Sequence, residues 1–72
     1  MARDLEPYQR RVVAERAELD ARRARLAVFM ADREHMVLLS RPERLLLLMQ
    51  RDLMRQYSDV LGWRIEEWER EE

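Results

Sequence analysis

The side chains best suited to chemistry in this 72-residue chain are guanidinium groups and aromatic rings. All fourteen basic residues are arginine, lysine and cysteine are absent, and His35 is the single histidine. The chain therefore offers few of the nucleophiles, bases and zinc ligands that catalysis or a metal site needs. Guanidinium groups, in contrast, bind phosphate through paired hydrogen bonds and stack on flat rings. We expect a binding protein with no catalytic residue, no metal and no cofactor.

The densest basic cluster consists of Arg22, Arg23 and Arg25. A cluster of this kind could hold an anionic ligand. The more common explanation is a solvated helix surface on which the arginines pair with Asp20 or Glu18. The residues alone leave both explanations open.

Tyr8 is a second candidate for ligand binding. At the start of a helix an aromatic ring can lie flat while its hydroxyl reaches water, although the residue alone favours ordinary packing. Tyr57 and Arg64 are one heptad apart and so share a stripe of a second helix. In an antiparallel hairpin the end of that helix lies beside the start of the first. Tyr8 and Arg64 are therefore expected to be neighbours, within one chain or across an interface.

One long helix has to position Tyr8 and the arginine cluster. From Pro7 to about residue 33 the chain has no glycine and no further proline, and good helix formers dominate. This composition predicts a helix over about residues 7–33, with Pro7 in its first turn, where the missing N–H costs nothing.

A second helix has to position Tyr57 and Arg64. Ser40 and Glu43 have the spacing of a capping box, which predicts a helix over about residues 41–70. Residues 34–39 then form a turn or a short helical link, and Gly62 indicates a bend or a close contact inside the second helix. The expected fold is all-α, a single domain over residues 1–72 folded as an antiparallel helical hairpin.

The apolar pattern exceeds what one hairpin can bury. The first helix carries large residues on one side and small residues on the opposite side, and the second carries two apolar heptad rows. A short chain with one thin core is marginally stable, so we expect a homo-oligomer. The alternative is that alanine fills a solvated face because of its helix propensity. The four rows are Leu5, Val12, Leu19, Leu26 and Met30; Ala14, Ala17, Ala21, Ala24, Val28 and Ala31; Leu46, Leu53 and Val60; and Leu47, Met54, Leu61 and Trp68.

Net charge and hydropathy exclude other classes. Residues 66–72 carry −4, which leaves +3 on the rest of a chain whose net charge is −1. This balance does not suit a protein that binds duplex DNA. The apolar runs, such as residues 45–49, are too short to cross a membrane, and the N-terminus lacks a signal-peptide pattern. A soluble intracellular protein with a small anionic partner is the expectation.

Five segments of the chain follow a recognisable order and spacing: Pro7–Glu15, Ala17–Asp20, Leu26–Phe29, Tyr57–Gly62 and Arg64–Ile65. Together, over about residues 5–65, they resemble the small phage proteins of the anti-CBASS cyclic-oligonucleotide sponge family. The resemblance implies a helical homohexamer in the cytoplasm of the host bacterium. It also implies that the protein binds cyclic dinucleotides such as 3′,3′-cGAMP, as well as cyclic trinucleotides at separate pockets in many members, and so withholds the messenger from its CBASS effector.

The same resemblance implies roles for individual residues. Tyr8 matches the aromatic residue that stacks on a nucleobase, Arg23 a basic residue on the phosphate, and Arg64 a further arginine of the dinucleotide pocket. Arg25 lies near the positions that form the family's trinucleotide pocket. Arg22, from the same arginine cluster, is the remaining ligand-binding candidate. The chain departs from the family pattern in having arginine rather than lysine at position 23, a more apolar run at 45–48, a tryptophan at 63 and an acidic end.

A different class of function also fits these residues. The apolar surplus could bind a host protein, which would make the chain a small helical interaction module such as a phage regulator or an antitoxin-like adaptor.

Overall fold

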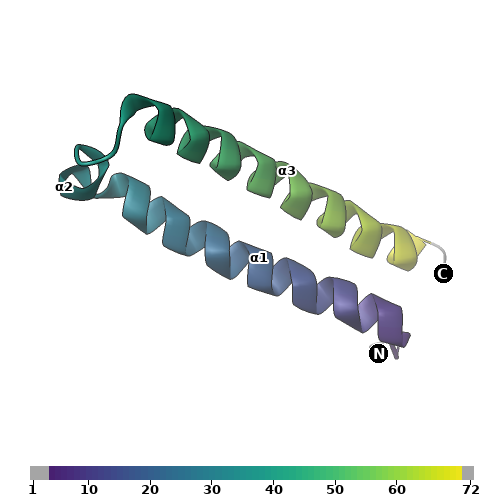
Figure 1. The fold of residues 1–72 in the computed structure, drawn as a ribbon. Helices are drawn as coiled ribbons and strands as arrows, with labels where there is room; N and C mark the ends of the chain where they lie inside the picture. Colours follow the sequence, from purple (N-terminus) through teal and green to yellow (C-terminus); the bar gives the residue numbers. More distant parts are fainter. Residues whose placement is uncertain (1–3, 71–72) are drawn as a thin grey trace.

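The computed structural model describes residues 4–70, and these residues are helical along nearly their whole length (Figure 1). Three helices follow one another, α1 (Pro7–Ala31), α2 (Arg33–Met36) and α3 (Arg41–Arg70), and no strand occurs within the described range. The predicted all-α class is confirmed. Helices α1 and α3 lie side by side in opposite directions, so the N- and C-terminal ends share one end of the molecule (Figure 1). Residues 1–3 and 71–72 of the predicted domain lie outside the described residues.

The first turn of α1 is held by a side chain that points back along the helix. Pro7 occupies the start of the helix, as expected from its missing N–H. The side-chain oxygen Oε1 of Gln9 accepts a hydrogen bond from the backbone N–H of Glu6 at 2.8 Å. This hydrogen bond joins the residues on either side of Pro7 and Tyr8, and Gln9 is itself buried. The turn that carries Tyr8 is therefore fixed in place.

The chain reverses direction between α1 and α3. Helix α1 ends at Ala31, before the expected boundary near residue 33, because Asp32 is extended and its carboxylate accepts the N–H of Glu34 at 3.0 Å to begin α2. The Arg44 guanidinium then donates to the carbonyl oxygens of Met36 at 3.4 Å and Leu39 at 3.0 Å. One side chain of α3 thus joins the start of that helix to two carbonyl groups of the link.

Helix α3 begins with half of the predicted capping box. Ser40 Oγ accepts the N–H of Glu43 at 3.2 Å. The return hydrogen bond, from the Ser40 N–H to the Glu43 carboxylate, is not made within the described part of the chain. Within residues 4–70 this return hydrogen bond is made at the start of α1 instead, where the Gln9 side chain accepts the backbone N–H of Glu6.

A thin apolar layer joins the two long helices. Val12 and Leu19 from α1 and Leu61 and Trp68 from α3 are buried. They belong to the large-residue row of α1 and to one heptad row of α3. The layer is completed by partly buried Leu5, Met54 and Ile65.

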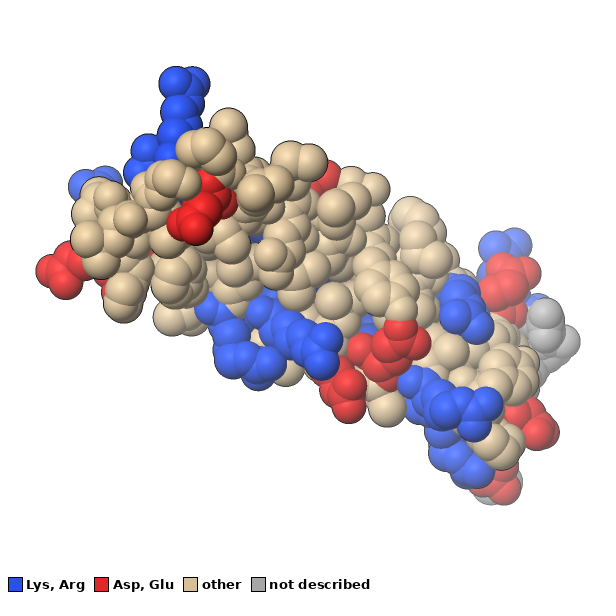
Figure 2. Space-filling model, in the orientation of Figure 1, with Lys and Arg blue, Asp and Glu red and all other residues tan. Residues whose placement is uncertain are grey.

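The small-residue side of α1 and one apolar row of α3 remain uncovered in the single chain. Each residue of the small-residue row of α1 is exposed, and so is each residue of the α3 row that consists of Leu46, Leu53 and Val60. Leu46 and Leu53 are each 61% exposed and Val28 is 74% exposed. Figure 2 shows a broad uncharged area over α3, with charged groups gathered along the α1 edge and near the ends.

The dimensions of the molecule agree with this surplus of exposed surface. The radius of gyration is 16.2 Å, against about 11 Å for a compact chain of this length. The accessible surface is 6062 Å², against about 4,800 Å² for a compact monomer of this mass. The single chain therefore exposes about 1,200 Å² more than a compact domain would. No helix in the described range combines the length and the apolar character needed to span a membrane.

Gly62 makes the close contact that was expected of it. It lies inside α3 and is buried, and a Cβ atom built there would lie 2.8 Å from Cζ of Arg16 on α1. The helix continues through the glycine without a break. The missing side chain leaves the space that the Arg16 guanidinium fills.

We expect the effect of Gly62→Ala on stability to depend on Arg16. In an Arg16→Ala background, alanine at 62 should raise the free energy of unfolding by about 1 kcal/mol, the usual gain over glycine in a helix. In the native background the gain should be smaller, because the Arg16 guanidinium has to move away. Urea unfolding at a fixed protein concentration measures both, and equal gains would show that the contact is absent.

Candidate functional site

Tyr8 lies in the first turn of α1, at the end of the molecule that holds both chain termini (Figure 1). Its side chain is exposed to 48%. The ring contacts Trp68 of α3, with ring centroids 6.0 Å apart and an interplanar angle of 83°. This edge-on geometry is favourable between aromatic rings and leaves at least one face of Tyr8 available.

Arg64 lies at the same end of the molecule as Tyr8. Residues four apart share one face of a helix, so Arg64 is one turn before Trp68, the residue that contacts Tyr8. Arg64 is exposed and forms no ion pair with any residue in the range 4–70. The structure thus brings Tyr8 and Arg64 to one end of the hairpin, with Trp68 between the two helices there.

Arg23 lies in the second half of α1 and is not free. Its Nη1 donates to Asp20 Oδ1 at 3.1 Å, which is the pairing that the sequence offered as the common explanation of the arginine cluster. Asp20 Oδ1 also accepts the Ser58 hydroxyl of α3 at 2.7 Å. The Arg16 Nε donates to Ser58 Oγ at 3.5 Å and lies 3.9 Å from Asp20 Oδ2.

These four residues form a polar cluster across the two helices, which we call the α1–α3 polar cluster (Arg16, Asp20, Arg23 and Ser58). Ser58 is 1% exposed, so its hydroxyl has to be satisfied inside the protein. The cluster was not predicted, because no pattern within one helix shows that Ser58 faces Asp20. The serine itself was the signal that could have indicated the cluster, because it is a polar residue on the apolar side of the second helix.

The α1–α3 polar cluster shifts the ionisation of Asp20. The hydrogen bond from Ser58 lowers the pKa of its carboxyl below the ordinary 3.8; partial burial opposes this, and Arg23 and Arg16 add to the lowering. A carboxyl with a lower pKa in the folded protein stabilises the fold above the ordinary pKa. That contribution is lost as the pH falls through the lowered value.

The other two candidate arginines stand apart from Tyr8 and Arg64. Arg22 and Arg25 are exposed on α1, and neither is paired with another residue of the described range. The structure therefore places Tyr8 and Arg64 at one end of the hairpin and Arg22, Arg23 and Arg25 farther along α1.

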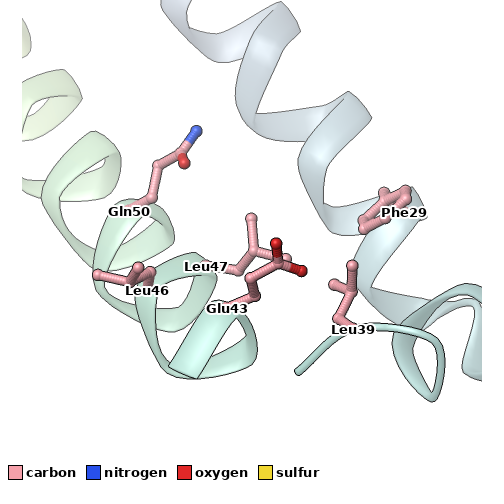
Figure 3. A pocket seen from close by; sticks show the side chains of 6 residues that line it. All are labelled: Phe29, Leu39, Glu43, Leu46, Leu47 and Gln50. Atoms are coloured by element: carbon pink, nitrogen blue, oxygen red, sulfur yellow. The ribbon is translucent and has the colours of Figure 1, made fainter. Parts of the chain in front are cut away.

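A surface hollow lies at the opposite end of the molecule, between the end of α1, the link and the start of α3 (Figure 3). Its volume is about 330 Å³. The lining is mainly apolar and includes the Glu43 carboxylate but none of the candidate arginines, so the hollow does not suit an anion. Nor do residues 4–70 gather three side chains that could ligate a metal ion. The lining residues are Phe29, Leu39, Glu43, Leu46, Leu47 and Gln50.

The fold and these side chains define a small all-α protein that exposes an aromatic ring at Tyr8 and arginines without an ion pair in the described range. Residues 6–67 match the model of the Sequestin family. The chain belongs to the Sequestin family, which confirms the resemblance drawn from its residues, and the family's name indicates a sequestering role. No match is found among curated proteins or among solved structures.

Asp20→Asn should destabilise the protein at neutral pH and much less in acid. We expect the free energy of unfolding to fall by about 1 kcal/mol at pH 7, a value reduced for the partial exposure of the ion pairs. The difference from the native protein should close as the pH falls below the lowered pKa of Asp20. Urea unfolding from pH 7 down to pH 2 measures this. Glu18→Gln, an exposed position on the same helix, is the matched control and should change little at any pH.

Proposed function

We propose that this chain sequesters cyclic dinucleotide messengers, without cleaving them, at sites formed between copies of itself. The observation that supports this most directly is the placement of Tyr8 and Arg64 at one end of the hairpin. Tyr8 has an accessible aromatic ring, and Arg64 has a positive charge that no acidic group among residues 4–70 pairs with. Membership of the Sequestin family supports the same function. In this proposal the protein acts in the cytoplasm of a phage-infected bacterium and withholds the messenger from a CBASS effector.

The proposed ligand matches the chemistry of these residues. A cyclic dinucleotide such as 3′,3′-cGAMP has two flat bases and two anionic phosphates. Tyr8 would stack on a base, a contact worth ~1–3 kcal/mol. Arg64 and Arg23 would bind phosphate through charge-assisted hydrogen bonds. Sequestration needs only tight binding, on the order of −12 kcal/mol for a nanomolar dissociation constant, so catalytic residues are not required.

Two chains supply the groups around each ligand in this proposal. Tyr8 and Arg23 are fifteen residues apart on α1, which is about 22 Å along the helix. An isologous contact between two chains offers each half of a two-fold ligand the same groups. In such a contact Tyr8 of one copy would approach arginines of the other copy, so that one chain does not have to span the roughly 22 Å between Tyr8 and Arg23.

The uncovered apolar rows support assembly. The excess surface of about 1,200 Å² per chain exceeds the ~800 Å² per partner that a standard protein interface buries. Leu46, Leu53 and Val60 form an exposed row on α3, and Arg64 lies on the same side of that helix. A contact made through this row would carry Arg64 into the interface. The proposed assembly is a homohexamer, as the resemblance to phage sponges implies.

The remaining basic residues are proposed for a second ligand. Arg22 and Arg25 are exposed and uncompensated in the described part of the chain, so their charge is available for a phosphate. A cyclic trinucleotide, which presents three phosphates, is the proposed ligand of this surface. It lies apart from Tyr8, as separate pockets require.

A small helical interaction module is the second candidate function. The observation that favours it is the same exposed row on α3, which could lie against a host protein instead of another copy of this chain. Direct ligand titration separates the two functions.

Isothermal titration calorimetry with 3′,3′-cyclic dinucleotides should show binding to the native protein. Tyr8→Ala should weaken it at least about 30-fold, because two stacking contacts of ~1–3 kcal/mol are lost. Tyr8→Phe keeps the ring and is the matched control. A folded native oligomer that gives no heat with any purine dinucleotide would exclude the proposed function. If Tyr8→Ala instead dissociates the oligomer, Tyr8 is a packing residue.

Light scattering should give a mass several times that of the 8.9 kDa chain. Leu53→Glu should lower that mass, because it places a charge in the exposed α3 row. Val37→Glu is the control, since Val37 is equally apolar and is exposed to 70% in the link, away from that row. A native protein that is a folded monomer would contradict the proposed assembly.

A further inference from the structure

Trp68 packs between α1 and α3 at the end of the hairpin where Tyr8 lies. It is one of four buried apolar residues in the described range and is only 9% exposed, although it is two residues from the end of α3. It also lies just beyond residues 6–67, the range that matches the family model. The contact between Trp68 and Tyr8 is therefore made by a residue outside the part of the chain that places it in the family.

The geometry of this contact suits a ring that has to bind something else. Had Trp68 stacked flat on Tyr8, it would have covered one face of the tyrosine completely. The interplanar angle of 83° instead places the two rings edge to face, with centroids 6.0 Å apart. Tyr8 keeps almost half of its surface exposed while one side of its ring rests on a buried partner.

A tyrosine in the first turn of a helix has few neighbours of its own to hold it. Pro7 alone precedes it on the helix, and the ring contact that Tyr8 makes within residues 4–70 is with Trp68 of α3. Immobilising a mobile side chain on binding costs about 0.5–1.5 kcal/mol. A partner that fixes the ring beforehand removes that cost from the binding step.

We propose that Trp68 is a positioning residue for ligand binding, which holds the Tyr8 ring in the orientation that stacks on a nucleobase. This inference rests on the proposed function, since it requires that Tyr8 contact a cyclic dinucleotide. It assigns a role to the end of α3 that the family match does not cover. The second tryptophan, Trp63, does not share this role, because it is 61% exposed and lies about 140° around α3 from Trp68.

The first test is calorimetric titration of the full chain with 3′,3′-cGAMP. Trp68→Leu, which keeps an apolar side chain and removes the ring, should weaken binding about fivefold to tenfold. Trp68→Phe keeps a ring that can meet Tyr8 edge-on and should restore affinity to within about twofold of the native value. Trp63→Leu is the matched control and should bind as the native protein does. All variants should keep the native oligomer mass.

The outcomes of this titration are distinct. Native affinity in Trp68→Leu would overturn the inference while leaving the proposed function in place. Equal weakening in Trp68→Leu and Trp68→Phe would also overturn it, because a role in core stability or a direct indole contact would then explain the loss. The absence of binding by the native protein would remove the proposed function and this inference with it.

A second measurement does not depend on the folding of Trp68→Leu. In Trp63→Phe, Trp68 is the single tryptophan, so its fluorescence reports on the neighbourhood of Tyr8 alone. Titration with 3′,3′-cGAMP should change that emission in step with the calorimetric occupancy. Emission that stays constant at full occupancy would show that the ligand does not reach the Tyr8–Trp68 pair, and would overturn the inference.

Discussion

Two helices packed along their lengths can cover only one side of each other, and both long helices here are apolar on more than one side. The single chain buries the rows that contain Leu19 and Leu61 and leaves the rows that contain Val28 and Leu53 in solvent. About 25 cal/mol is gained for each Å² of apolar surface removed from water, so covering the exposed apolar side chains of these rows would add stability that the single chain lacks. Because one chain cannot bury all of its apolar rows, we expect copies of the chain to pack against one another. The proposed ligand sites depend on that contact.

The contact between α1 and α3 is set by polar groups as well as by apolar ones. Ser58 is buried and donates to Asp20 at 2.7 Å, and the Arg16 guanidinium lies in the space left by Gly62. A shift of one helix along the other by one turn would leave the serine hydroxyl unsatisfied and press the arginine against a side chain. Apolar rows alone tolerate such a shift far better, because leucine and methionine repack easily. The α1–α3 polar cluster therefore fixes the register that carries Trp68 to Tyr8.

Patterns within one helix were enough to predict the two long helices and the apolar rows that a single hairpin cannot all bury. The sequence also indicated a bend or a close contact at Gly62, and the structure shows the contact without a bend. Tyr8 and Arg64 were expected to be neighbours, and the structure places both at one end of the molecule. It did not show that Ser58 meets Asp20 or that Trp68 meets Tyr8 edge-on, because such pairs depend on the relative register and rotation of two helices. The boundary at Ala31 was missed for a local reason, since Asp32 caps α2 instead of extending α1.

The arginines of the proposed site differ in how much charge they have to offer. Arg23 is already paired with Asp20, whereas Arg64 has no acidic partner in the described range. Bringing copies of Arg64 together at an interface costs electrostatic energy, because like charges repel at short distance in a partly dry contact. In the proposed assembly the apolar rows would have to offset that cost while no ligand is bound, and the phosphates of a bound ligand would remove it. Ligand binding and assembly are then linked, since a ligand that binds only the assembled form stabilises that form by mass action.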